Sequence, residues 1–309
     1  MGKVAFVFPG QGSQRVGMGR DAAEASARAR EVFDAADAAL GESLSSLCFD
    51  GPEDALRLTE NTQPAILTTS VALLRALDRR CDMAAGHSLG EYSAHVAAGT
   101  LELADAVRLV RRRGGYMQDA VPVGDGAMVA VLKAERSAVD EACAAVDGVV
   151  EAANYNCPGQ IVIAGAAGAV AAAAEVLRAG GARVTALPVS APFHTSLMEP
   201  AAERLAPDLA ATPMRDPSVP VYVNADARPV RDAEAARDAL RRQVSRPVRW
   251  EETVERMAAD GATLFVEIGP GKVLTGLIRR IDKTLARMNV ETMADVAGVR
   301  AAIEEHRRG

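Results

Sequence analysis

The hydrophobic pattern of the first 120 residues alternates short apolar strands with longer helices. Residues 4–8 form a continuous apolar run that ends at Pro9, which is typical of a strand buried in a parallel sheet. A second short apolar segment, residues 83–85, precedes Gly86. Apolar periodicity and helix-favouring composition predict the helices between and after them, over residues 20–39, 64–78, 88–98 and 103–117. This alternation favours an α/β fold with a parallel sheet.

The pattern changes after the turn-rich segment 121–126. Between residues 127 and 189 the order of predicted elements is strand, helix, strand, strand, helix, strand, which is typical of a ferredoxin-like domain. The strands are expected over 127–132, 149–154, 160–164 and 183–189, and the helices over 135–146 and 167–179. Strands and helices then alternate again, with strands over 219–224 and 263–268 and helices over 253–260 and 273–281.

This change of pattern predicts two domains. We expect residues 124–188 to form a small domain inserted into a larger α/β domain made of residues 1–123 and 189–309. A chain of 309 residues is long enough for this arrangement. Its 49% hydrophobic and 25% charged residues are those of a globular protein rather than a disordered one.

Composition also excludes several partners. Aromatic residues make up only 4% of the chain and the formal net charge is -6, which argue against a nucleic-acid-binding protein. No apolar run is long enough to cross a membrane, so no membrane contact is expected. The four cysteines form no CxxC pair and the histidines no HExxH pair, so we expect no disulfide, no metal site and a reducing, cytoplasmic location.

The segment Gly86-His87-Ser88-Leu89-Gly90 matches the G-x-S-x-G pattern of a nucleophilic serine. A buried apolar segment precedes it and a predicted helix follows it, which is the context that the pattern requires. The glycines allow a close chain approach, and the helix N-terminus directs free N–H groups toward developing negative charge. Ser88 is therefore the candidate nucleophile.

A serine hydroxyl needs a base that takes its proton. We expect His306, in a charged C-terminal segment, to be solvated, and His95 lies about two helical turns beyond Ser88. His87 is the chain neighbour of the serine and points elsewhere. His194 remains as the candidate base, and the alternative is a structural histidine held by hydrogen bonds.

Other polar segments leave their roles open. The Gly-rich residues 9–14 form either a tight strand-to-helix turn or a loop whose backbone N–H completes an oxyanion hole with that of Leu89. In the arginine run 111–113, two side chains are expected to be solvated, and one turned inward could bind a substrate carboxylate. Polar residues beside apolar runs are more often structural than functional; here they are Gln63, Asn154, Asn156, Asn224 and Gln243.

A set of short motifs occurs in order along nearly the whole chain. They are PGQGSQ (9–14), NTQPA (61–65), GHSLGEY (86–92), RG (113–114), GAM (126–128), N-x-PGQ (156–160), FH (193–194) and EIGPGKVL (267–274). Between residue 4 and about residue 283 the chain resembles the malonyl-CoA:acyl carrier protein transacylase family of fatty-acid and polyketide synthesis. The resemblance implies an α/β-hydrolase-like large domain with a ferredoxin-like insertion, in agreement with the pattern described above.

The resemblance also implies roles for individual residues. It places the nucleophile at Ser88, the base at His194, and the oxyanion-binding backbone amides at Gln11 and Leu89. Arg113, the arginine directly before glycine, corresponds to the residue that holds the malonyl carboxylate.

Three further residues receive roles from the resemblance. Gln243 corresponds to the glutamine whose main-chain carbonyl orients the base, so no acidic third member is expected. Gln63 and Phe193 are expected at the substrate, and the bulky ring of Phe193 leaves little room for an α-methyl branch.

The implied reaction transfers malonyl from malonyl-CoA through a malonyl-serine to the phosphopantetheine thiol of acyl carrier protein. No cofactor is expected beyond the coenzyme A thioester that serves as substrate. The family's carrier protein is acidic and so is this chain, so docking requires a local basic patch, and a monomer is expected. The available cations are Arg111, Arg112, Arg241, Arg242, Arg246, Arg249, Lys272, Arg279, Arg280 and Lys283.

Three alternatives remain. The first is a discrete acyltransferase that serves a polyketide synthase in trans. The second is a serine esterase or thioesterase, which would release a free acid without a thiol acceptor. The third is a non-catalytic binding module, against which the intact Ser88, His194 and Arg113 argue.

Overall fold

The larger of two sheets has six strands in the order β11-β10-β1-β2-β7-β8. The computed structural model describes residues 2–189 and 191–308. All neighbouring pairs in this sheet are parallel except β7 and β8, which are antiparallel at one edge. The strands are β1 (Lys3–Phe8), β2 (Met83–Gly86), β7 (Val221–Val223), β8 (Arg228–Val230), β10 (Ala262–Ile268) and β11 (Ala286–Val290).

Strand β1 is apolar on both sides because both faces of this sheet are covered. Val4, Phe6 and Phe8 belong to one core cluster, whereas Ala5 and Val7 belong to another. Successive strand residues point to opposite faces, so a continuous apolar run is required wherever helices cover both. Helices α5 (Thr59–Leu77), α6 (Gly90–Ala97) and α14 (Met293–His306) contribute to the first cluster, and α12 (Trp250–Ala259) and α13 (Val273–Ile281) to the second.

Two predicted helices differ from those of the structure. The predicted helix over 20–39 is two helices, α1 (Arg20–Ala25) and α2 (Ala27–Leu40), because Ser26 adopts an extended backbone and caps α2 with its hydroxyl. Helix α5 begins five residues before Pro64, where the sequence pattern placed its start. Proline lacks the N–H that would bond the carbonyl of Glu60, and Arg111 donates to that carbonyl instead.

Besides α14, four helices of the larger part of the chain were not indicated by the sequence pattern. These are α3 (Leu44–Asp50), α4 (Glu53–Arg57), α10 (Glu199–Ala211) and α11 (Ala233–Gln243). Helix α7 (Leu103–Asp119) packs against α5, and a short 3₁₀ helix, η1 (Ser196–Met198), precedes α10.

The second sheet has five strands in the order β6-β3-β5-β4-β9. Four of them alternate with helices along residues 126–186 and pair antiparallel, whereas β9 (Val248–Arg249) comes from a distant segment and pairs parallel with β4. The sequence did not indicate β9. The other elements are β3 (Gly126–Leu132), α8 (Arg136–Ala144), β4 (Val150–Cys157), β5 (Gln160–Ala166), α9 (Ala167–Ala179) and β6 (Arg183–Ala186).

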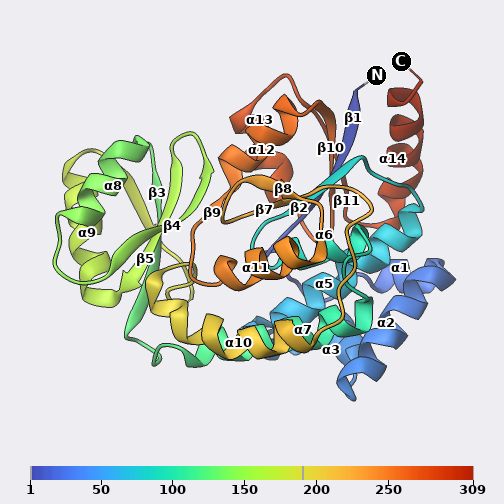
Figure 1. The fold of residues 1–309 in the computed structure, drawn as a ribbon, viewed down its shortest axis with the longest axis horizontal. Helices are drawn as coiled ribbons and strands as arrows, with labels where there is room; N and C mark the ends of the chain where they lie inside the picture. Colours follow the sequence, from blue (N-terminus) through green and yellow to red (C-terminus); the bar gives the residue numbers. More distant parts are fainter. Residues whose placement is uncertain (1, 190, 309) are drawn as a thin grey trace.

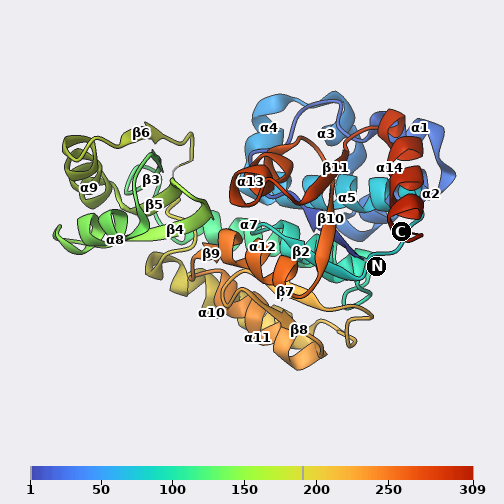
Figure 2. The same cartoon turned by 90° about the horizontal axis from the view of Figure 1, so that it is seen from above.

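The second sheet is covered by different partners on its two faces. Helices α8 and α9 pack on one face around Val129 and Val131. On the opposite face, Met128, Val162 and Ala164 join the core of the larger sheet. Figures 1 and 2 show the second sheet with α8 and α9 at one end of the molecule, joined to the rest along the face that is not covered by these helices. Among the described residues, no helix is both long and apolar enough to span a lipid bilayer.

Candidate active site

The turn that carries Ser88 is built by close chain contacts between β2 and α6. Ser88 has a φ of 51°, in the left-handed region that non-glycine residues rarely adopt. A Cβ added to Gly86 would lie 1.9 Å from the carbonyl carbon of Gly90, and one added to Gly90 would lie 2.1 Å from the carbonyl oxygen of Phe8. Only glycine fits at both positions, so the G-x-S-x-G spacing is a steric requirement of this turn.

Asn224, which follows β7, fixes the turn from the neighbouring strand. Its side-chain amide donates to the carbonyl of Gly86 at 2.7 Å, and its Oδ1 accepts the backbone N–H of Ser88 at 2.6 Å. These two bonds satisfy backbone groups on both sides of the strained serine, so Asn224 stabilises the conformation that exposes the hydroxyl.

Ser88 and His194 lie within hydrogen-bond distance. The hydroxyl oxygen is 2.7 Å from Nε2 of His194, and Nδ1 is 2.9 Å from the backbone carbonyl of Gln243. A carbonyl only accepts, so Nδ1 carries the proton and Nε2 is free to take the one from serine. His194 also has a positive φ, 63°, so both members of the pair are held in a strained backbone conformation.

The carbonyl of Gln243 occupies the place where a serine hydrolase often has a carboxylate. Gln243 is the last residue of α11, so its carbonyl is one of those that the helix leaves unbonded at its negative end. This end of the helix favours positive charge and can therefore stabilise the imidazolium that forms when His194 takes a proton.

Burial depresses the basicity of the free imidazole. His194 is 3% exposed, and burial, followed by the nearby charge of Arg113, lowers its pKa to about 3. The imidazole is consequently neutral at physiological pH, as a general base must be.

Gln11 and Leu89 lie where an oxyanion hole is expected. Strands β1 and β2 are parallel neighbours, with Phe8 paired to Gly86, so the loops that follow them lie side by side. Leu89 is at the N-terminus of α6, and both residues line the same cavity as Ser88. Within residues 2–189 and 191–308, neither backbone N–H donates a hydrogen bond, so both are available to a ligand.

Arg113 is the arginine of the run that faces inward. It is 1% exposed, and its guanidinium donates to Oε1 of Gln63 and to Oε1 of Gln243, each at 2.8 Å, and to the Ser88 hydroxyl at 3.3 Å. Burial lowers its pKa, yet a guanidinium stays protonated in proteins. A fixed positive charge therefore lies directly beside the serine hydroxyl.

Helix geometry directs the other two arginines elsewhere. Arg111 forms an ion pair with Glu42, and Arg112 forms one with Asp208. Successive helical residues point about 100° apart, so only one of three consecutive side chains can face the site.

A cavity of about 620 Å³ connects these groups and lies between the two sheets. Its volume is in the range of small-molecule sites. Phe193 and Gln63 line it, together with residues of the second sheet such as Met128 and Asn154. The loops that follow β1 and β2, together with nearby helices, thus face the second sheet across one binding site.

The structure places the remaining histidines away from the reacting serine hydroxyl. The ring of His87 lines the cavity and lies 2.8 Å from Oδ1 of Asn156. His95 is fully buried, and burial lowers its pKa to about 3. His306, which was expected to be solvated, is partly exposed, and its ring lies 2.8 Å from the Thr263 hydroxyl.

Two residues at the site were not identified from the sequence. Asn224 was treated as a structural polar residue, and Glu91 was only part of a motif. Glu91 is fully buried, and its Oε2 accepts from the Asn224 backbone N–H at 2.8 Å and from the Gln243 side chain at 2.9 Å. A carboxylate on a helix that is otherwise buried and uncharged is the sequence signal that could have revealed it.

No cluster of metal ligands accompanies this site. Among the described residues, no three His, Cys, Asp or Glu side chains gather as a metal-binding group.

Comparison with known proteins gives one consistent family. The family model of the acyl transferase domain matches residues 5–301. The malonyl CoA-acyl carrier protein transacylase of Escherichia coli (strain K12) is 48% identical over 311 residues, covering 98% of this chain and all of that protein. The crystal structure of an acyl carrier protein S-malonyltransferase from Vibrio cholerae is 47% identical, with a TM-score of 0.94 over 96% of this chain and 99% of that one.

A similar structure contains a carrier protein as well. A type II polyketide synthase acyl-carrier protein in complex with its malonyl-transacylase gives a TM-score of 0.95 at 44% identity, covering 97% of this chain and 99% of that one.

Proposed function

This chain belongs to the acyl transferase family, among the malonyl CoA-acyl carrier protein transacylases, and we propose that it transfers malonyl from malonyl-CoA to acyl carrier protein through a malonyl ester of Ser88. The observation that carries this proposal is the hydrogen-bonded pair of Ser88 and His194 with the buried cation of Arg113 in the same cavity. A nucleophile, its base and an anion-binding group are together what transfer of a dicarboxylic acyl group requires.

In the first half-reaction His194 takes the proton of Ser88, and the hydroxyl oxygen attacks the thioester carbonyl. The backbone N–H groups of Gln11 and Leu89 stabilise the oxyanion, a contribution of roughly 10²–10³ in rate for each donor. The C–S bond then breaks, and His194 protonates the departing thiolate of coenzyme A. The malonyl group is left as an ester on Ser88.

The second half-reaction reverses these roles. His194 takes the proton of the phosphopantetheine thiol, the sulfur attacks the ester, and Ser88 regains its proton as the new thioester forms. The same imidazole therefore acts as base and as acid in each half. A hydrolase would use water here, which is the distinction between this proposal and an esterase or thioesterase.

We assign the selection of malonyl to the residues around its free carboxylate. Arg113 offers a planar pair of donors to that carboxylate, and Gln63 holds one arm of the guanidinium. Phe193 lines the cavity beside His194 and limits the room for an α-branch.

Intact mass spectrometry tests the proposal directly. Purified protein incubated with malonyl-CoA should gain the mass of one malonyl group, which should disappear when a holo carrier protein is added and reappear on that carrier. Loss of the label to water at the same rate without the carrier would favour a thioesterase.

The depressed pKa of His194 predicts the pH dependence. Because the imidazole stays neutral until the pH approaches 3, we expect kcat/KM for loading of Ser88 to change by no more than about threefold as the pH falls through 6.5. Malonyl-N-acetylcysteamine is a suitable substrate, because it carries no phosphate that titrates in this range. A decline centred on pH 6.5 would show an ordinary histidine and contradict the assignment.

The stability of the fold limits how far the pH can be lowered in that measurement of kcat/KM. Below pH 6.5 the unfolded chain binds a proton at His194 that the folded chain does not bind until about pH 3. The contribution of His194 to the free energy of unfolding therefore decreases as the pH falls between these values. Circular dichroism at each pH separates this loss from a titration of the base.

We also propose the finer description of the fold. The larger domain, made of residues 1–123 and 189–309, is α/β-hydrolase-like, and residues 124–188 form a ferredoxin-like insertion. The antiparallel order β6-β3-β5-β4 supports the insertion, since it is the sheet order of a βαββαβ unit. The segment that supplies β9 extends this sheet and ties it to the larger one.

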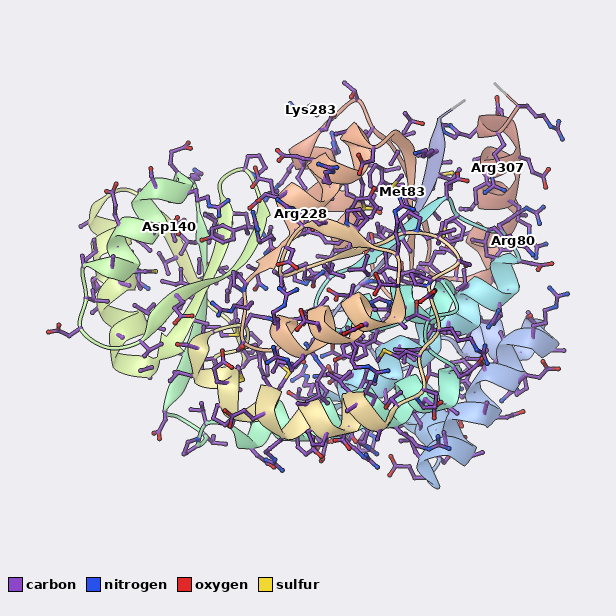
Figure 3. The ribbon with its side chains drawn as sticks, in the orientation of Figure 1. Arg80, Met83, Asp140, Arg228, Lys283 and Arg307 are labelled. Atoms are coloured by element: carbon purple, nitrogen blue, oxygen red, sulfur yellow. The ribbon has the colours of Figure 1, made fainter. Side chains whose placement is uncertain are left out.

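We propose that an acidic carrier protein docks on the surface of α13. Five of the ten cations named above form ion pairs within the chain, namely Arg111, Arg112, Arg241, Arg242 and Arg249. Arg246, Lys272, Arg279, Arg280 and Lys283 form none among the described residues, and the last four lie on or beside α13. Gly271, before this helix, packs beside Ser13 of the loop that contributes to the cavity. Figure 3 shows Lys283 near α13 and Arg80 on a distant side of the molecule.

Charge reversal on α13 tests this docking surface. The double replacement Arg279→Glu and Arg280→Glu should raise the KM for the carrier by about 5- to 30-fold, and added salt should reduce the difference. Loading from malonyl-N-acetylcysteamine should be unaffected. The matched control reverses Arg75 and Arg80, which are also exposed and make no ion pair among the described residues. Equal effects of the two double variants would exclude α13 as the site.

The pathway depends on which carrier is native. We propose the carrier of fatty-acid synthesis, and a discrete malonyl acyltransferase of a polyketide synthase is the second candidate, favoured by the similar structure bound to a polyketide carrier. Relative kcat/KM values with the two kinds of carrier distinguish them.

We also propose that the enzyme acts as a monomer, because one chain supplies every site residue. We further propose that it acts in a reducing cytoplasm, because its four cysteines are free thiols.

A further inference from the structure

We propose that Glu91 is a positioning residue for malonyl selection, which it controls by orienting the side chain of Gln243 and, through it, the guanidinium of Arg113. The proposal rests on the proposed function, because it assigns to Glu91 an effect on the choice of acyl group. Glu91 does not line the cavity.

Arg113 has no carboxylate of its own in the described parts of the chain. No Asp or Glu oxygen among the described residues lies within 4.0 Å of its guanidinium nitrogens. The two terminal nitrogens donate instead to neutral acceptors, Oε1 of Gln63 and Oε1 of Gln243. The orientation of a glutamine amide is ambiguous in itself, because rotation by 180° exchanges its oxygen with its NH₂ group. If Gln243 rotated in this way, two N–H donors would face each other at Arg113.

Glu91 removes this ambiguity. Its Oε2 accepts from the NH₂ group of Gln243 at 2.9 Å, and that group also donates to the Ser88 carbonyl at 3.0 Å. With the NH₂ group held by these two acceptors, Oε1 of Gln243 must point toward Arg113. The rotated amide would instead bring its oxygen against the carboxylate, which is repulsive.

Protonation of Glu91 would weaken this role without changing the direction in which Gln243 points. Burial raises its pKa to about 7, whereas hydrogen bonds from Gln243 and Asn224 and the charge of Arg113 oppose that rise. Both hydrogen bonds reach Oε2, and Oε1 has no partner within the described residues. A proton on Oε1 would leave Oε2 as the acceptor that Gln243 requires.

The test compares malonyl with acetyl loading on Ser88 by intact mass, at a pH above 7. Glu91→Met keeps the length of the side chain but provides no acceptor oxygen, and it should lower the malonyl-to-acetyl ratio of loading rates by about tenfold, within the range of coupled network residues. Glu91→Gln keeps a weaker, neutral acceptor and should lower the ratio by about threefold. In a Gln243→Ala background, which retains the backbone carbonyl that faces His194, Glu91→Met should change the ratio by less than about twofold.

Two controls make the outcome specific. Glu267 is a second fully buried carboxylate, which accepts from Leu274 and Thr275 at the start of α13, and Glu267→Gln should leave the ratio unchanged. Circular dichroism and thermal unfolding establish that each variant is folded. If Glu91→Met is not obtained folded, Glu91→Gln carries the test alone.

The results separate the possible failures. A wild-type protein that loads no malonyl would overturn the proposed function itself. A wild type that loads malonyl, with Glu91 variants that slow malonyl and acetyl loading equally, would give Glu91 a purely structural role and overturn this inference. A shift in the ratio that persists undiminished in the Gln243→Ala background would show that Glu91 does not act through Gln243.

Discussion

Replacement of Ser88 by alanine should abolish the gain of one malonyl mass that we expect for the wild-type protein. The hydroxyl forms the ester of the proposed intermediate, and its oxygen lies 2.7 Å from the base. In serine hydrolases, loss of the nucleophile reduces turnover by roughly 10⁶-fold, with only binding and the oxyanion hole remaining. Intact mass after incubation with malonyl-CoA, followed by peptide mapping of any label, measures this.

Ser93 provides a matched control for that variant. It is a buried serine on the same helix, α6, and lies outside the cavity. Ser93→Ala should load malonyl at a rate close to that of the wild type. A Ser88→Ala protein that still gains the label on another residue would refute the assignment of the nucleophile.

Replacement of Arg113 by alanine should reverse the preference for malonyl. Without the guanidinium, the malonyl carboxylate would be buried without a partner, which is expensive. Truncating one partner of a buried charged contact typically costs about 2–5 kcal/mol, so malonyl loading should fall by about 30- to 4,000-fold. Acetyl carries no charge and should lose far less, so the measured quantity is the ratio of malonyl to acetyl loading.

The neighbouring arginines are the controls for this experiment. Arg111 and Arg112 form ion pairs away from the cavity, so Arg111→Ala and Arg112→Ala should leave the ratio within about threefold of the wild type. Arg113→Lys should rescue only in part, since a point charge cannot donate to Gln63 and Gln243 in the planar fork of arginine. An unchanged ratio in Arg113→Ala would refute the role of this residue as the carboxylate clamp.

The local pattern of residues was sufficient to predict an element wherever a segment's own residues determine its structure. The continuous apolar run of β1 requires a strand covered on both faces, and both faces are covered. Of the two glycines around Ser88, Gly86 is required by a contact of about 2 Å within the turn itself, whereas Gly90 is required by the carbonyl of Phe8 in β1. Helix α9 was predicted with the bounds that it has in the structure, because small apolar residues favour a helix throughout.

The sequence pattern did not predict those elements whose position depends on a contact with a distant part of the chain. Strand β9 has only two residues, and it exists because β4 provides a partner for it. Helix α5 begins before a proline, and Arg111, 51 residues after Glu60, satisfies the carbonyl that the proline leaves free. No local propensity carries this information.

The sequence by itself determined the family, the α/β class of the fold and the identity of the candidate nucleophile and base, because short motifs and apolar periodicity are local properties. The spacing of the arginine run left open which side chain faces inward, and only the family resemblance pointed to Arg113. In the structure the packing of α7 against its neighbours buries this residue. Only the tertiary structure brought Glu91, Asn224 and Gln243 together from α6, from the residue after β7 and from the end of α11. Hydrogen bonds between such distant residues form only when the helices and strands have packed, and for this reason the network behind the serine was invisible in the sequence.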